Sequence, residues 1–267
     1  MLASIREPRT TVGGVNLVSG FRPELWRGLV PDGTPADLTG FDLGLTGADG
    51  FVTPGTQHDA LLWLAGSAYD IVFGEARAAI AALAPVAALA DDASGWPYLH
   101  FRDLTGFVDG TENPILLDAP GVVQVREGQP GAGGAVLLLQ VWPHDVAAWE
   151  ALSVAEQEAV IGRAKPDSVE PDPGPATSHV ARSDQDTFGE VFRRSMLFGT
   201  VSHRGTIFVG FCARQQPLLA MLESMAGVRD ALTRSSHPTT GAYSFVPPID
   251  AVRRFATKEA TDAGQTS

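Results

Sequence analysis

The sequence predicts an α+β fold of two ferredoxin-like units, in which antiparallel sheets are flanked by helices. Short apolar runs that suit strands alternate with segments whose apolar residues recur at helical spacing. No Gly-rich fingerprint of a Rossmann fold accompanies these strands. The glycine-rich stretch at residues 131–134 is the expected boundary. We therefore divide the chain into an N-terminal half, residues 1–133, and a C-terminal half, residues 134–267.

The N-terminal half alternates between strand and helix signals. A stretch rich in Pro and Gly, residues 31–54, predicts a long loop. In chain order we expect the end of a helix and a turn at residues 1–14, a strand at 15–21, a short helix at 23–26, a strand at 60–65 and a helix at 71–83.

The C-terminal half repeats this alternation and places a Pro-rich loop, residues 166–177, near its middle. In chain order we expect a strand at 135–142, helices through 149–152 and 155–161, strands at 191–192 and 206–211, and a helix at 218–225.

Charge and cysteine content narrow the function classes. The formal net charge of −12 argues against a nucleic-acid partner, because phosphate binding needs clustered Lys and Arg. Cys212 is the only cysteine, which excludes an intrachain disulfide and a cysteine-rich metal site, and suits a reducing cytoplasm. The N-terminus has no apolar signal segment, and the Ala-rich stretch at 78–90 is shorter than the ~20 residues that cross a bilayer. We expect a cytoplasmic protein without membrane contact.

An acidic residue between two glycines is the first candidate functional residue, in the segment Gly106-Phe107-Val108-Asp109-Gly110. Glycine is chosen where the backbone takes positive φ or lies against another surface. An acid held between such glycines is therefore expected to face another group. The alternative is a turn in which Asp109 bonds its own backbone.

A second group of candidates lies downstream, around His179 and Arg193. Of six histidines, His58 and His144 each precede an Asp at an expected helix start, where Asp is a good cap. His179 differs, because it ends the long loop at 166–177 and Arg193 follows fourteen residues later on a strand-like segment. That separation is enough for the chain to pass from one face of a bound group to the other.

Together these segments resemble the dye-decolourising peroxidase family of haem enzymes, closest to its compact, non-secreted branch. Residues 106–110 match the family's Gly-x-x-Asp-Gly signature, and residues 111–114, 205–211 and 238–241 extend the resemblance over nearly the whole chain. The resemblance implies haem b bound between the two ferredoxin-like halves. Family members usually begin with another strand before the point where Met1 falls, so we expect the N-terminal half to lack its first strand. A truncated gene model is the simpler explanation; if Met1 is the true start, the sheet must be repaired by another chain or left exposed.

The resemblance also implies four haem-site residues. His179 corresponds to the proximal iron ligand. On the distal side, Asp109 would carry the peroxide proton, and Arg193 would stabilise the charge that develops as the O–O bond lengthens. Ser195 would return to the face of Arg193 and hold an ordered water. The alternative for Arg193 is a haem-propionate anchor or a surface salt bridge.

Further residues have weaker support. Asp230 could accept a hydrogen bond from the second nitrogen of His179, although its neighbours do not indicate this role. Arg163 and Lys165 could bind the haem propionates. Four aromatic residues could relay electrons to bulky substrates or could simply belong to the core: Trp63, Trp142, Trp149 and Tyr243.

The expected function is a cytoplasmic haem b peroxidase that reduces H2O2 and oxidises small aromatic donors or dyes. A chlorite dismutase-like oxidoreductase does not need the Asp109 motif, so the motif argues against it. Two further hypotheses are a haem-binding or iron-handling protein with incidental turnover, and an inactive scaffold. We expect a homo-oligomer. An encapsulating shell has no support, because the polar tail at 257–267 contains no apolar docking peptide.

Overall fold

The computed structural model describes residues 14–99 and 102–262. The helix end and turn expected at residues 1–14 therefore lie outside the described part of the chain, apart from Gly14.

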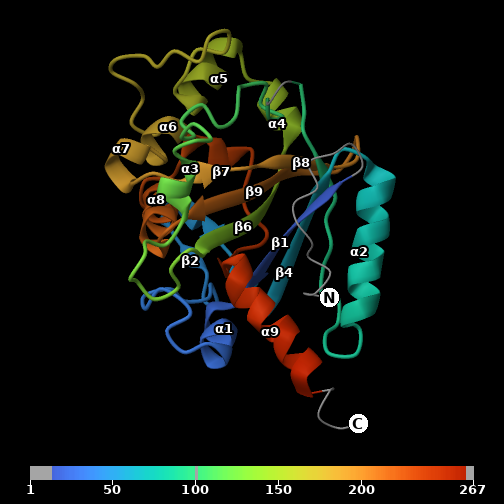
Figure 1. The fold of residues 1–267 in the computed structure, drawn as a ribbon. Coiled ribbons are helices and arrows are strands. Elements are labelled where there is room, and N and C mark those ends of the chain that lie inside the picture. The colour runs from blue at the N-terminus through green and yellow to red at the C-terminus, as the bar shows by residue number, and fades with distance from the viewer. Residues whose placement is uncertain (1–13, 100–101, 263–267) are drawn as a thin grey trace.

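An antiparallel sheet forms the centre of the molecule (Figure 1). The strands are β1 (Val15–Phe21), β2 (Leu45–Thr46), β3 (Val52–Thr53), β4 (Ala60–Gly66), β5 (Gly95–Trp96), β6 (Ala135–Pro143), β7 (Phe192–Arg193), β8 (Met196–Gly199), β9 (Arg204–Cys212) and β10 (Ala242–Val246). Their order in the sheet is β4-β1-β10-β6-β9-β8-β5, and β7 pairs separately with β9. β2 and β3 form a small ladder of their own.

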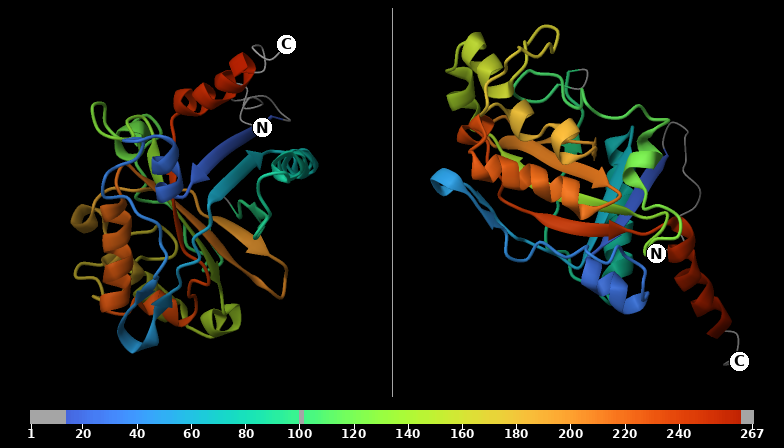
Figure 2. Two further views of the ribbon diagram at one scale, coloured as in Figure 1. Left: turned by 90° about the horizontal axis from the view of Figure 1, so that it is seen from below. Right: turned by 90° about the vertical axis from the view of Figure 1, so that its left-hand side faces the viewer.

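Helices flank this sheet. They are α1 (Pro23–Leu29), α2 (Tyr69–Leu83), α3 (Ala119–Val123), α4 (Val146–Glu150), α5 (Val154–Ile161), α6 (His179–Arg182), α7 (Gln185–Phe188), α8 (Gln215–Gly227) and α9 (Ile249–Asp262), with 3-10 turns η2 (Ala48–Gly50) and η3 (Ala231–Arg234). Figure 2 shows α8 lying along the sheet and α2 standing beside β4. No helix within the described ranges has the length and apolar character that a membrane span requires.

Strands from both halves of the chain join in the one sheet. β1 and β4 of the N-terminal half pair along their whole length, from Val15↔Gly66 to Phe21↔Ala60. β1 then meets β10 at Phe21↔Phe245, and β10 pairs with β6. The antiparallel sheet with flanking helices confirms the predicted α+β class. The boundary between residues 133 and 134 stays a prediction.

The core lies on both faces of β6, which is why its sequence is an almost unbroken apolar run. On one face Leu138 packs beneath α8, whose Leu218, Met221, Leu222 and Met225 recur at helical spacing. A second apolar cluster on the other face contains Leu137, Ile207 and Val209.

Among the elements that the sequence patterns do not predict are β8, β10, α6 and α9. For α6 the reason is length, because four residues are too few to show an apolar period. Its start is set instead by an N-cap, in which Ser178 Oγ accepts a hydrogen bond from the Ala181 N–H at 3.3 Å. His179 is therefore the first residue of a helix, and not the end of a loop.

Candidate active site

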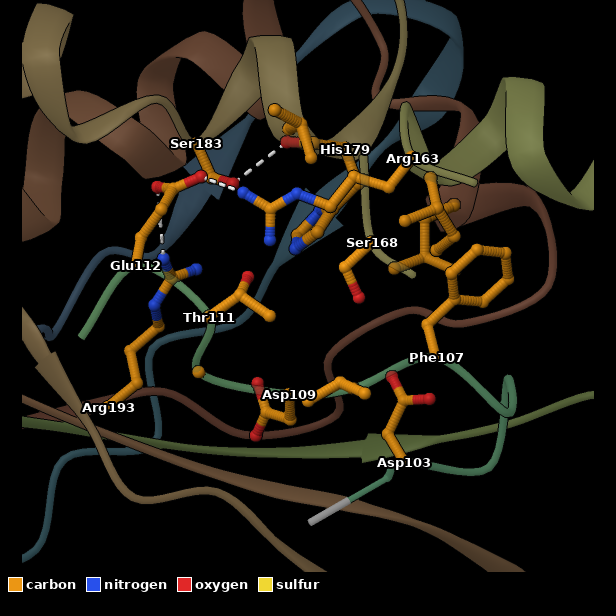
Figure 3. A pocket seen from close by; sticks show the side chains of 15 residues that line it. Asp103, Phe107, Asp109, Thr111, Glu112, Arg163, Ser168, His179, Ser183 and Arg193 are labelled. Atoms are coloured by element: carbon orange, nitrogen blue, oxygen red, sulfur yellow. Dashed lines mark hydrogen bonds and ion pairs between the residues drawn. The ribbon is translucent and has the colours of Figure 1, made fainter. Parts of the chain in front are cut away.

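Three of the four predicted haem-site residues, Asp109, His179 and Arg193, line one pocket (Figure 3). His179 and Asp109 lie on opposite sides of it. Ser195, the fourth, is not among the lining residues. The pocket is formed by Asp103, Phe107, Val108, Asp109, Gly110, Thr111, Glu112, Ile161, Arg163, Ser168, His179, Val180, Ser183, Arg193 and Leu232.

The Asp109 loop is a tight turn that two glycines make possible. Gly106 and Gly110 have φ values of +85° and +70°, which side chains on L-residues rarely allow. The Asp103 N–H donates to the Phe107 carbonyl at 3.1 Å, and the Gly106 N–H donates to the Asp103 carbonyl at 3.1 Å. Among the described residues, the Asp109 carboxylate has no hydrogen-bond partner. It therefore remains available to a group in the pocket.

The carboxylate that bonds the loop backbone is that of Asp103. Its Oδ1 accepts hydrogen bonds from the Thr105 N–H at 2.9 Å and from the Thr105 hydroxyl. Burial raises the pKa of Asp103 to about 6; the Thr105 hydroxyl opposes this rise and the charge of Asp109 adds to it. No sequence pattern singles out Asp103. Its only signal is an Asp two residues before a Thr, which is common in turns.

His179 is held by a carboxylate from a distant part of the chain. Its Nδ1 lies 2.7 Å from Oδ2 of Asp230, which is fully buried. Oδ1 of Asp230 accepts from the Leu232 N–H at 2.9 Å, which orients the carboxylate. Burial alone would lower the pKa of His179, but Asp230 outweighs it and the pKa is raised. With Nδ1 engaged, Nε2 is the nitrogen free to bind a ligand in the pocket.

Arg193 reaches the pocket from β7 and makes few side-chain contacts. Its Nη2 lies 3.5 Å from Oε2 of Glu112, and its buried Nε has no hydrogen-bond partner among the described residues. Glu112 also contacts Arg163, which in addition lies 2.6 Å from Glu170. Two carboxylates thus already compensate the charge of Arg163. An unpartnered, buried nitrogen leaves Arg193 with capacity for another acceptor.

Lys165 points elsewhere. Its Nζ donates to Oε1 of Gln157 at 2.6 Å and lies 5.3 Å above the ring of Phe107. It is not among the lining residues of the pocket. Its predicted propionate contact therefore has no geometric support here.

Of the four aromatic candidates, Trp149 has its ring against a residue that lines the pocket. This ring meets Phe107 edge-on at 6.4 Å, and its Nε1 donates to the Thr105 carbonyl at 3.1 Å. Trp63 stacks on Phe211, and the remaining two, Trp142 and Tyr243, pack in the core beneath α8.

Comparison with known proteins decides the family. A family model described as Dyp-type peroxidase, C-terminal, matches residues 100–251. The dye-decolorizing peroxidase of Rhodococcus erythropolis is 36% identical over 256 residues, which cover 91% of this chain and 74% of the relative. That of Mycobacterium tuberculosis is 32% identical over 277 residues, which cover 93% and 82%. This chain belongs to the dye-decolorizing peroxidase family.

Solved structures of similar proteins agree with this assignment. The dye-decolorizing protein of V. cholerae superposes with a TM-score of 0.82 at 35% identity, covering 90% of this chain and 82% of that one. DyPB from Rhodococcus jostii RHA1 gives 0.82 at 33% identity, covering 89% and 80%. Variants of that R. jostii protein have been solved in complex with heme.

Family membership makes this chain a peroxidase enzyme. It disfavours an iron-handling protein and a chlorite dismutase-like oxidoreductase. The pocket brings together the imidazole of His179, the carboxyl of Asp109 and the guanidinium of Arg193.

Proposed function

We propose that this peroxidase binds haem b in the His179 pocket, reduces H2O2 and oxidises small aromatic donors or dyes. The observation that carries the proposal is the His179–Asp230 pair at 2.7 Å, facing the same pocket as Asp109 and Arg193. A histidine whose second nitrogen bonds a buried carboxylate is a well-oriented and electron-rich axial ligand.

The residues of the pocket suit haem. His179 offers one unhindered ring nitrogen, and a porphyrin needs only one such ligand from the protein. Apolar side chains at Phe107, Ile161 and Leu232 suit the flat, apolar macrocycle. The unpartnered Nε of Arg193 suits a propionate or a peroxide oxygen. When bound, haem supplies the redox chemistry of the reaction.

The distal residues have separate roles in the reduction of H2O2. Reduction of H2O2 to two waters consumes two electrons and two protons. Asp109 accepts the proton of the bound peroxide and returns it to the departing oxygen, directly or through a water. Arg193 is permanently charged and stabilises the negative charge that builds up as the O–O bond lengthens. Ser195, two residues further on but not among the residues that line the pocket, would hold an ordered water near Arg193.

On the proximal side Asp230 holds His179 through Nδ1, so that Nε2 would be the nitrogen that binds the haem iron. Arg163 would hold the haem propionates in competition with Glu112 and Glu170, which contact its guanidinium. The enzyme works in the cytoplasm as a homo-oligomer.

The absorption spectrum of the purified protein tests this proposal. We expect a Soret band and a rapid spectral change on adding one equivalent of H2O2. His179→Ala should abolish stable haem incorporation or leave weakly held haem with an altered spin state. Normal haem content and an unchanged ferric spectrum in that variant would move the ligand elsewhere, with His203 next to be tested.

A further inference from the structure

On the edge of β7 that faces away from β9, a side chain and not a further strand bonds the backbone of Arg193. Arg193 faces Gly210 of β9, and the Arg194 N–H donates to the Val209 carbonyl at 2.8 Å. In an antiparallel ladder, bonded pairs alternate with pairs whose peptide groups point outward. Because Arg194 and Val209 form a bonded pair, the N–H and C=O of Arg193 point away from β9.

The side chain of Asn113 forms hydrogen bonds with both of these outward-pointing backbone groups of Arg193. The Arg193 N–H donates to Oδ1 of Asn113 at 2.8 Å, and Nδ2 of Asn113 donates to the Arg193 carbonyl at 2.8 Å. The carboxamide thus substitutes for the peptide of a further strand. Asn113 lies only four residues after Asp109. Its two bonds therefore connect the loop that carries the proposed acid to the strand that carries the proposed cation.

The second glycine of the Gly-x-x-Asp-Gly motif leaves room for this connection. A Cβ on Gly110 would lie 2.7 Å from Nδ2 of Asn113, which is closer than real Cβ contacts come. A second amide supports the same junction, because Oε1 of Gln185 accepts from the Val191 N–H at 2.8 Å and its Nε2 donates to the Glu112 carbonyl at 3.2 Å.

We propose that Asn113 is a positioning residue that sets where the Arg193 guanidinium lies relative to Asp109. The inference rests on the proposed function. Side-chain contacts do not fix the position of the Arg193 guanidinium. Within the described part of the chain, its one ionic contact, to Glu112, is long at 3.5 Å, and its Nε has no hydrogen-bond partner. Its backbone must therefore determine its place, and Asn113 holds that backbone on the side that β9 leaves free.

The test compares Asn113→Ala with Gln57→Ala in haem-loaded enzyme. Gln57 is the control, because it makes the same two-way connection to a strand peptide outside the pocket, besides bonds to the Phe41 N–H and the His58 carbonyl. The Tyr243 N–H donates to its Oε1 at 2.9 Å, and its Nε2 donates to the Tyr243 carbonyl at 2.8 Å. Both substitutions remove amide hydrogen bonds, so both should lower the melting temperature.

Only Asn113→Ala should affect the reaction with peroxide. We expect the first spectral change on mixing with H2O2 to slow by about tenfold or more, because a misplaced catalytic group loses rate steeply. The KM for the reducing donor should stay unchanged. Fluoride binding to the ferric enzyme, which depends on a nearby donor and involves no turnover, should weaken by a similar factor.

Asn113→Asp supplies a second readout. Its carboxylate can accept from the Arg193 N–H but repels the Arg193 carbonyl, whereas its protonated form can donate to that carbonyl. The rate relative to the unaltered enzyme should therefore recover as the pH is lowered. A loss of packing alone would give a ratio that does not change with pH.

Equal peroxide rates and equal fluoride affinities for Asn113→Ala and Gln57→Ala would overturn the inference. If Asn113→Ala fails to retain haem, the rates of Asn113→Asp across pH decide. A ratio of the Asn113→Asp rate to that of the unaltered enzyme that does not change with pH counts against the inference. An unaltered, haem-loaded enzyme that does not react with H2O2 would contradict the proposed function first, and the inference with it.

Discussion

At the scale of single residues, partners from distant parts of the chain define the site. Asp230 lies 51 residues from His179 in the sequence, and Asn113 lies 80 residues from Arg193. Each supplies hydrogen bonds that orient a candidate residue, His179 or Arg193, which the sequence had identified without its partner. A fully buried carboxylate such as that of Asp230 is costly unless it is bonded, so its hydrogen bonds also contribute to the stability of the pocket.

The first prediction ranks the two distal residues. We expect Arg193→Leu to slow the first spectral change with H2O2 more than Asp109→Asn does. An ordered water can take over part of a proton transfer, but no neutral group replaces a positive charge, and losing one preorganised donor costs about 10²–10³ in rate. Stopped-flow mixing at one pH and matched haem occupancy measures both. An Asp109 variant that is slower by about tenfold or more would reverse the order and show that proton transfer is limiting.

The second prediction concerns Asp103 and the pH dependence of stability. Its folded pKa of about 6 exceeds the ordinary value of 3.8, so the folded chain binds this proton more tightly than the unfolded chain. This contribution to stability is complete at low pH and is lost as the pH rises towards 6. Asp103→Asn should therefore melt above the unaltered haem-free protein at pH 7, by roughly a few degrees, and should match it near pH 4.

Thermal unfolding of both proteins between pH 4 and pH 8 provides the measurement. If Asp103→Asn melts lower at pH 7, the bonds from Thr105 to the ionised carboxylate outweigh the cost of its burial.

At the scale of elements, the short helix α6 is placed by the end of α5. α5 begins with a capping box, in which Ser153 and Glu156 bond each other's N–H groups, and it ends at Gly162 in the left-handed conformation with φ +91°. A Cβ on Gly162 would lie 2.6 Å from Oγ of Ser178, the N-cap of α6. The close approach of these two helix ends therefore positions His179.

The third prediction separates this contact from backbone strain. Gly162→Ala and Gly128→Ala each place alanine at positive φ, at +91° and +79°, which costs about 1–2 kcal/mol. Only at Gly162 would the new Cβ meet another side chain, since Gly128 has open space around it. Both should lower stability, but only Gly162→Ala should lower haem content and shift the Soret band. Equal haem content in the two variants would show that α6 can move without disturbing His179.

At the scale of the whole molecule, the formal net charge of −12 acts on every approaching substrate. A negative field slows the encounter with anionic donors and leaves neutral donors unaffected, and dissolved salt screens it. The reaction with the donor therefore depends on overall charge as well as on the pocket.

The fourth prediction follows for dye oxidation. The rate should be higher in mildly acidic buffer than at neutral pH for both donor types, because proton supply favours the reaction, and the increase should be larger for an anionic dye. Raising the ionic strength at neutral pH should speed the anionic dye and leave a neutral phenol unchanged. Steady-state rates for the two donors across pH and salt measure this. Flat profiles for both donors would contradict the role of proton supply and that of net charge.

The sequence by itself determined the fold class, the elements with clear apolar periods and the three residues that meet in the pocket. These features are local, because a helix or strand period, or a motif such as residues 106–110, depends only on residues that are close together in the sequence. The sequence did not predict α6 and β8, since four residues each are too few to show a period, and it did not predict α9 although that helix has 14 residues.

Only the tertiary structure decided which groups orient the candidate residues. The sequence offered Asp230 only as a possible acceptor with no support from its neighbours, and packing brought it 2.7 Å from His179. No local pattern connects Asn113 with Arg193, and none shows that the pKa of the partly buried Asp103 is raised. The physical reason is that such contacts depend on the register of β7 against β9 and on how loops close over the sheet. Those arrangements follow from the free energy of the whole fold, and a run of neighbouring residues does not encode them.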